Sequence, residues 1–356
     1  MAFCLAQKCH AFFVSADYAV ENADRNLSRE KNMAQLPFCF PPIETYQGYS
    51  FVLGVLLAYP EYSEIQYRSY INLMCQKTDH LFSIDLTFTD ALWDDYYKQG
   101  LIEKNVYDAA NFGKKSLIRF LKERIDEGYY LLLYDLDEYY LPYTNAYKKF
   151  HSNHDTYIYG YEGECFLAEA YKSAHLSLLT VKQEEIVNAL LSKKAYKEAN
   201  KIRRFAVFRP WPHGKVKADR QELLRGIRKF YEEAEPVADH NGTVYGFGVY
   251  KVLLENMKNL CDEENASLRP LRCIWEHKKL MVRRIEYMYP DAKDGRLEMM
   301  REICDEMELV FRIMMKYNRL LKREILERAC WKFQAVIDKD MQWYKKYIQQ
   351  EGAKTE

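Results

Sequence analysis

Two side chains in the segment 128–169 have the types and spacing needed for the proton-transfer half of a catalytic site. His154 opens a strand-like run, and Glu169 lies two-thirds of the way along the run that would pair with it. If Glu162 and Gly163 are the two turn residues of this hairpin, His154 lies diagonal to Glu169 on one face. Diagonal neighbours have Cα atoms roughly 7 to 8 Å apart. We therefore expect the carboxylate to orient the imidazole as a general base.

A second pair of carboxylates ends the run that precedes this hairpin. Asp135 and Asp137 stand at i and i+2, which would suit acid–base chemistry or a metal ion. More often such a pair ends a strand by capping the following loop or by meeting a lysine, and we favour that interpretation. His151 and His175 could join His154 as metal ligands, but the spacing gives no further support for a metal site.

The same stretch resembles a known family. The residues that carry the resemblance are a strand end of the form D-x-Y-Y-L-P-Y, followed after about ten residues by a strand that a histidine opens. They are Asp137, Tyr139, Tyr140, Leu141, Pro142, Tyr143, His154, Gly160 and Tyr161. This pattern is similar to the N-terminal domain of the butirosin biosynthesis protein H family, convincingly over about 125–190 and more loosely over 36–245.

The resemblance implies a papain-like fold and a cysteine, a histidine and an aspartate that transfer an acyl group from a carrier protein to an amine. His154 matches the general base, and Glu169 falls where the orienting carboxylate is expected, as Glu in place of Asp. The nucleophile should begin the first core helix, but the segment 44–50 (ETYQGYS) contains no cysteine. Cys39, upstream of that start, and Ser50 are the two candidates that remain.

Two classes of function follow from this incomplete site. In the first, the chain is an acyltransferase-like protein of antibiotic or other natural-product biosynthesis, acting on a small molecule or peptide with an acyl or peptidyl carrier protein as partner. In the second, it is a catalytically impaired relative that binds a peptide or carrier protein without chemistry. Neither class calls for a cofactor. Whether the chain is an enzyme is left open by the missing cysteine.

The rest of the chain predicts an α+β protein. We expect an N-terminal extension over 1–35, a papain-like domain with helices on an antiparallel sheet over 36–245, and an α-helical C-terminal domain over 246–350. Apolar residues recur every three or four positions through the last region, typical of a helix pair with a shared core. Helices are predicted over 45–59, 64–75, 112–126, 218–235, 268–289 and 296–348, and strands over 129–137 and 203–211.

Composition limits the partners. The chain of 356 residues has 52 basic and 52 acidic residues, so no global field attracts nucleic acid or membrane. Between 193 and 229, thirteen basic and three acidic residues give +10, which suits an acidic partner or a solvated face. The nine cysteines show no repeated spacing, and Cys4, Cys9 and His10 are weak evidence for zinc. Without an evident signal peptide or long apolar run, we expect a cytoplasmic protein with free thiols.

Overall fold

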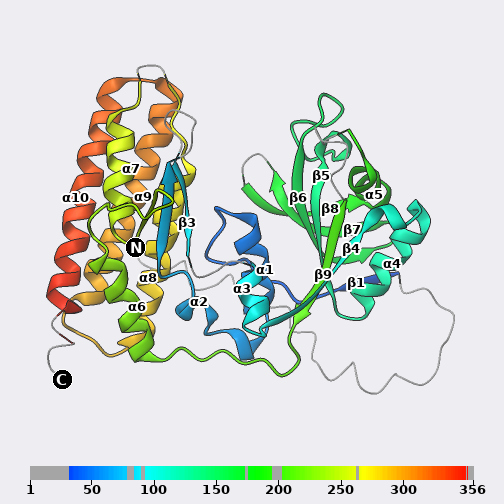
Figure 1. Ribbon diagram of the computed structural model, residues 1–356, viewed down its shortest axis with the longest axis horizontal. Coiled ribbons are helices and arrows are strands. Elements are labelled where there is room, and N and C mark those ends of the chain that lie inside the picture. Colours follow the sequence, from blue (N-terminus) through cyan, green and yellow to red (C-terminus); the bar gives the residue numbers. More distant parts are fainter. Residues whose placement is uncertain are drawn as a thin grey trace, which may run out of the picture. The chain divides into compact units, whose positions relative to one another are not determined.

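The computed structural model describes residues 32–77, 84–89, 93–172, 175–194, 203–261, 264–349 and 351. They confirm the α+β class, with antiparallel sheets and a helical C-terminal region (Figure 1). The described residues within 1–40, 54–59 and 100–214 form one compact unit, here called the sheet unit. Those within 41–53, 60–99 and 215–356 form the second, the helical unit. Compactness does not define evolutionary domains, so the predicted boundaries 1–35, 36–245 and 246–350 stay predictions, as does the papain-like topology.

The sheet unit is built on a seven-stranded antiparallel sheet. Its strands follow the order β4-β9-β5-β6-β7-β8, with β1 added to β6. The strands are β1 (Met33–Gln35), β4 (Ile102–Asp108), β5 (Tyr130–Asp137), β6 (Asn153–Glu162), β7 (Cys165–Lys172), β8 (His175–Lys182) and β9 (Arg204–Pro210). The helical segments are η3 (Ala109–Asn111), α4 (Lys114–Asp126), η4 (Glu138–Tyr140) and α5 (Gln183–Leu191). The predicted strands at β5 and β9 and the predicted helix at α4 are confirmed.

Helices α4 and α5 cover the core of this sheet. Leu117, Leu121 and Ile125 recur every fourth residue of α4 and are buried, which is the stripe that an amphipathic helix turns toward a core. They share one apolar cluster with Leu131 and Leu133 of β5 and with buried residues of α5. Each such side chain contributes roughly 1.5 to 3 kcal/mol on burial. This packing holds the end of β5 in place.

The predicted register of the β6–β7 hairpin is wrong, because the turn lies one residue later than expected. Glu162 pairs with Cys165, so the turn consists of Gly163 and the residue after it, with Gly163 at φ +55°. The register then shifts between Ile158 and Gly160, and Glu169 pairs with Tyr157. A bulge inserts one residue and changes every pairing beyond it, which a turn position alone does not reveal.

A second bulge lies in β5. The pairing with β6 shifts between Leu133 and Leu136, and Asp135 there has a left-handed backbone, φ +52°. Leu133 and Leu136 therefore both enter the core although they are an odd number of residues apart. The bulge explains why this run alternates poorly in the sequence.

The helical unit combines a small sheet with five longer helices. Strands β10 (Thr243–Tyr245), β2 (Leu73–Lys77) and β3 (Ile84–Phe88) form an antiparallel sheet in that order. The short helical segments are η2 (Pro60–Tyr62), α2 (Ile65–Arg68) and α3 (Trp93–Lys98). Helix α1 (Gln47–Leu57) is divided between the two units. The longer helices are α6 (Arg220–Glu232), α7 (Gly248–Lys258), α8 (Arg269–Met288), α9 (Arg296–Leu320) and α10 (Arg323–Tyr347).

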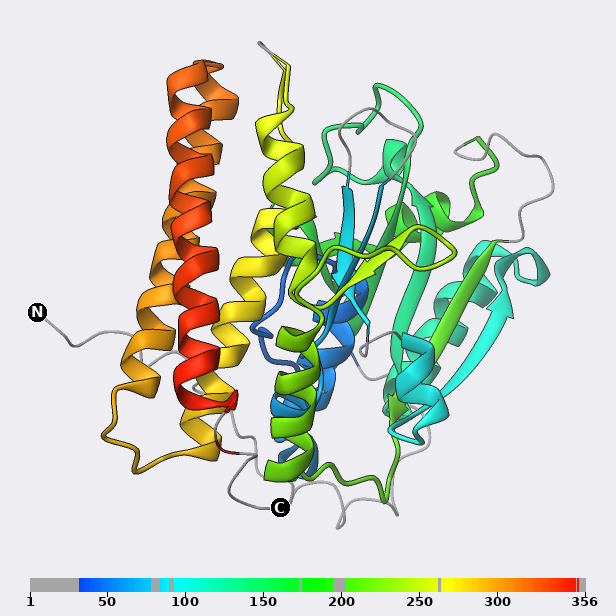
Figure 2. The ribbon, with the colours of Figure 1, turned by 60° about the vertical axis from the view of Figure 1, so that its left-hand side comes forward.

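The C-terminal helix pair is confirmed. Helices α9 and α10 run side by side (Figure 2), and Leu321 between them adopts a left-handed backbone, φ +51°, that ends α9. Met300, Met307 and Met314 of the predicted stripe are fully buried. The predicted helix over 64–75 is confirmed only over α2 and is wrong beyond Arg68, because the chain then enters strand β2.

Candidate functional site

The buried carboxylate of Asp137 is the centre of the candidate site. It ends β5, and its Oδ1 accepts a hydrogen bond from the Tyr139 amide at 3.2 Å, which caps the short helix η4. The residue is fully buried, so its charge needs several partners to compensate for lost hydration. The interpretation of this carboxylate as a loop cap is confirmed.

His151 is the second member of the site. Its Nδ1 lies 2.8 Å from Asp137 Oδ2, and its ring stacks on Tyr139 with centroids 4.5 Å apart. The side chain of His151 remains 28% exposed. A carboxylate at Nδ1 fixes the proton there and leaves Nε2 as the acceptor. The site therefore presents an oriented imidazole to solvent.

Hydrogen bonds join the two ends of the loop that carries His151. The Glu138 amide donates to the Ser152 carbonyl oxygen at 2.8 Å, and Ser152 Oγ donates back to the Glu138 carboxylate. The Lys148 amide donates to the Tyr139 carbonyl oxygen at 3.0 Å. These bonds close the tyrosine-rich segment 138–152 on itself, so the imidazole is held by the backbone as well as by Asp137.

Ser192 is the third member. This buried residue directly follows α5, and its Oγ donates to Asp137 Oδ2 at 2.5 Å. The Lys194 amide donates to Ser192 Oγ at 3.2 Å. The hydroxyl contacts the carboxylate and not the imidazole, so the three residues do not form a serine-nucleophile triad.

The structure does not place His154 and Glu169 as predicted. Glu169 pairs with Tyr157, three residues along β6 from His154. Because side chains alternate along a strand, an odd separation puts these two on opposite faces. Glu169 is fully buried and, after burial itself and Asp155, helps raise the pKa of Tyr157. The diagonal relation fails, and their catalytic roles stay predictions.

His154 itself is exposed and engaged locally. Its Nδ1 lies 3.1 Å from the Asp155 carbonyl oxygen, and its ring meets Tyr171 edge to face at 5.8 Å. The Asp135 amide donates to the Asp155 carboxylate at 2.9 Å, and burial raises the pKa of Asp155. These contacts tie the β5 bulge to the start of β6.

The two nucleophile candidates are engaged in local hydrogen bonds. Cys39 Sγ donates to the Gly54 carbonyl oxygen at 3.4 Å within the sheet unit. Ser50 Oγ donates to the Gln47 carbonyl oxygen at 3.2 Å and is fully buried in the helical unit. Helix α1 begins at Gln47, later than Cys39 would need in order to occupy its first turn. Their nucleophilic roles stay predictions.

A carboxylate from α8 binds two backbone amides just before α1. Glu276 accepts hydrogen bonds from the amides of Glu44 and Thr45, both at 3.0 Å, and from Thr45 Oγ1 at 2.6 Å. Arg272 Nε donates to the same carboxylate at 3.1 Å. Free amides near the start of a helix can bind an anion. Here the internal carboxylate of Glu276 already accepts hydrogen bonds from them.

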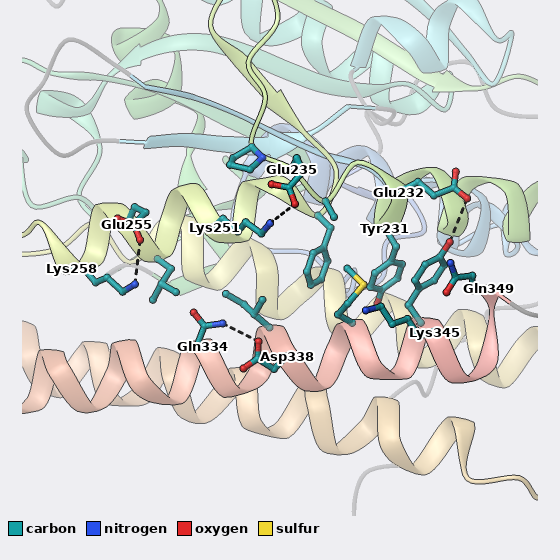
Figure 3. Close-up of a pocket in the computed structure, with 17 residues that line it drawn as sticks. Tyr231, Glu232, Glu235, Lys251, Glu255, Lys258, Gln334, Asp338, Lys345 and Gln349 are labelled. Carbon is teal, nitrogen blue, oxygen red and sulfur yellow. Dashed lines mark hydrogen bonds and ion pairs between the residues drawn. The ribbon is translucent and has the colours of Figure 1, made fainter.

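A separate groove of about 710 Å³ lies in the helical unit, between α7, α10 and the segment 231–236 (Figure 3). Apolar side chains such as Leu254 and Ile337 line it. On its rim, Lys251 pairs with Glu235 at 2.8 Å, and Lys258 pairs with Glu255, as Figure 3 shows. Charges paired in this way are typical of a solvated rim and not of an acid–base site.

The described ranges contain neither a metal-binding cluster nor a membrane-spanning helix. There, no group of three or more His, Cys, Asp and Glu side chains is arranged to hold a metal ion. Cys4, Cys9 and His10 lie outside those ranges. Among the helices of the described ranges, none has the length and apolar character needed to cross a bilayer.

The sequence predicts Asp137 only as a loop cap and does not identify its partners. His151 is predicted only as a possible metal ligand, and nothing in the sequence points to Ser192. The local signal for His151 was present, since a histidine closely follows a strand-ending aspartate across a tyrosine-rich loop. Ser192 is 55 residues from Asp137, and only the packing of α5 on the sheet brings the two together.

The comparisons with known proteins bear on this same segment. No curated protein matches the chain. A family model does match part of it, which confirms the predicted resemblance. Residues 109–169, which contain both Asp137 and His151, match the family described as butirosin biosynthesis protein H, N-terminal.

Proposed function

We propose that this protein acts in the biosynthesis of an antibiotic or related natural product, at a step that transfers an acyl group to an amine. The family match over 109–169 supports the biosynthetic role. The observation that carries the proposal is the His151–Asp137 pair inside that segment, with the carboxylate buried and the imidazole reaching solvent. The acyl donor is a thioester, carried by an acyl or peptidyl carrier protein.

In this mechanism His151 is the general base. Asp137 keeps the proton on Nδ1, so Nε2 can accept a proton from the attacking amine. As the carbon–nitrogen bond forms at the thioester carbonyl, the amine proton passes to Nε2. The carbon–sulfur bond then breaks, and the imidazolium returns the proton to the leaving thiolate. The substrate supplies the nucleophile, so the step needs no protein thiol.

The proposal relocates the base and its orienting carboxylate. His154 and Glu169 were the predicted pair, but the β6–β7 register separates them across the strand. His151 and Asp137 supply the same two functions three residues before His154 and at the end of β5. Cys39 and Ser50 are not needed in this scheme.

The second candidate is a binding protein that uses the fold without chemistry. The observation that favours it is the contact of Glu276 with the amides of Glu44 and Thr45. If this segment corresponds to the nucleophile helix of a papain-like enzyme, an internal carboxylate takes the place where catalysis would require a thiolate.

A thioester assay separates the two candidates. The purified chain is mixed with an N-acetylcysteamine acyl thioester and a simple primary amine, and amide formation is followed by mass spectrometry. We expect His151→Ala to lower the rate by about 100-fold or more. His154→Ala is the matched control, since it removes an exposed imidazole nearby, and it should stay within about 3-fold of wild type.

Each other outcome has a meaning. Loss of transfer in His154→Ala with activity kept in His151→Ala would show that the general base is His154, as the sequence predicts. Equal rates in the wild type and both variants would exclude a role for either histidine and favour the binding protein.

A further inference from the structure

Asp137 Oδ2 accepts two hydrogen bonds from different elements. One comes from His151 Nδ1 at 2.8 Å, and the other from Ser192 Oγ at 2.5 Å. The remaining oxygen, Oδ1, accepts from the Tyr139 amide at 3.2 Å. Ser192 therefore shares with the imidazole the one oxygen that orients it.

The direction of the Ser192 hydroxyl is set by its own donor. The Lys194 amide donates to Ser192 Oγ at 3.2 Å, which occupies a lone pair of the hydroxyl and directs its proton to Asp137. The result is a chain of bonds from the Lys194 amide through Ser192 to the carboxylate. Ser192 is 8% exposed, so water does not readily replace its hydroxyl.

We infer that Ser192 is a positioning residue that limits how strongly Asp137 holds the proton of the His151 imidazole, an inference that rests on the proposed role of His151 as the base. A donor to a carboxylate oxygen withdraws electron density that would otherwise stabilise a neighbouring imidazolium. Without Ser192, the hydrogen bond from His151 Nδ1 to Asp137 would be stronger. Ser192 lies outside the matched segment 109–169.

Other charged groups near the ring come from the elements around it. Glu138 of η4 accepts from Ser152, next to His151 in the chain. Lys193 and Lys194 follow Ser192 and are exposed. Exposed lysines are screened by solvent and salt, whereas the Ser192 bond acts directly on the orienting oxygen.

The test is an NMR measurement of the hydrogen-bonded Nδ1 proton of His151 in the full chain, which needs no substrate. This resonance should move downfield in Ser192→Ala, because the bond from Nδ1 to Asp137 strengthens when the competing donor is lost. It should not move in Ser192→Thr, which keeps the hydroxyl. Ser152→Ala is the matched control, because it removes a hydroxyl beside His151 that contacts Glu138 instead of Asp137. Ser192→Cys, a smaller perturbation with a weak donor, should move the Nδ1 proton resonance in the same direction if the alanine variant does not fold.

An unchanged Nδ1 proton resonance in the folded Ser192→Ala and Ser192→Cys variants, or an equal shift in Ser152→Ala, would overturn the inference. The proposed function is tested separately by the thioester assay. A shift without thioester transfer would keep Ser192 as a positioning residue and remove the proposed reaction. Transfer without a shift would keep the proposed reaction and remove the role of Ser192.

Discussion

The end of β5 and the middle of α8 bury the same kinds of groups in different ways. At the end of β5, Asp137 is buried while His151, its partner, is 28% exposed. On α8, the consecutive residues Glu276, His277 and Lys278 are all fully buried. Their side chains point in directions about 100° apart around the helix, so the middle of α8 is covered on more than one side.

The partners of the α8 residues are all internal. Lys278 forms an ion pair with Asp340 of α10 and lies over the ring of Phe230 at 5.4 Å. His277 Nε2 lies 2.8 Å from the Ile71 carbonyl oxygen. The comparison shows that burial alone does not mark a reactive site. A functional base needs a buried orienting group and a free face, and within the described residues compared here the end of β5 meets both conditions.

The largest loss of stability should come from removing Lys278 from its buried ion pair with Asp340. Lys278→Met leaves Asp340 as an uncompensated buried charge, and we expect the free energy of unfolding to fall by about 3 to 5 kcal/mol. Urea denaturation measures this. Lys279→Met is the control, because Lys279 is only half-buried, and Lys278→Met with Asp340→Leu should recover much of the loss. A loss below about 1 kcal/mol in Lys278→Met would show that α8 is not closed as described.

The second-largest loss of stability should come from replacing Glu276. Replacing it with Ala removes the acceptor of the Glu44 and Thr45 amides and of Thr45 Oγ1. Hydrogen bonds to a charged group are worth about 1.5 to 3 kcal/mol, so a loss of that size is expected in the same denaturation experiment. Thr45→Val, which removes only the hydroxyl, should cost less. If the two variants were equally stable, the anchoring of the segment before α1 would not depend on Glu276.

Acid should destabilise the helical unit through His277. Burial, followed by the nearby charges of Lys278 and Arg284, lowers the pKa of His277 well below its usual value. The unfolded chain then binds the proton first, so stability is full above pH ~6.5 and is lost as pH falls below it, by about 1.4 kcal/mol at pH 5.5. Comparing wild type with His277→Gln at pH 7.5 and 5.5 checks this. Identical pH dependence in both would contradict the assignment.

The smallest loss of stability should come from replacing His151 in the partly exposed His151–Asp137 pair. His151→Ala removes one partly exposed ring and one hydrogen bond to Asp137, so we expect a loss of about 1 kcal/mol. The same variant is expected to have the largest effect on thioester transfer. If His151→Ala unfolded the protein as Lys278→Met should, the contrast between the two regions would disappear.

Sequence reasoning succeeded where the signal is local. The stripe through α9 and α10 and the apolar run of β5 follow from periodicity and length. It failed at 64–75, where β2 forms because Leu73 to Lys77 pair with β3 and with Thr243 to Tyr245, far along the chain. Long-range pairing overrode a local helical pattern.

Of the candidate site, the sequence predicts only the loop-capping position of Asp137, for the same reason. The cap at Asp137 is a local feature of a strand end. The His154–Glu169 relation depended on a register that two features change, namely the later turn at Gly163 and the bulge between Ile158 and Gly160. The bond from Ser192 depends on how α5 packs, which no local pattern encodes.

The tautomer of the His151 ring tests the central claim most directly. If the buried carboxylate of Asp137 orients this imidazole, its ¹⁵N chemical shifts near neutral pH should show the proton on Nδ1. Asp137→Asn should abolish that preference, while His154→Ala should leave it intact. A wild-type ring with its proton on Nε2 would contradict the account.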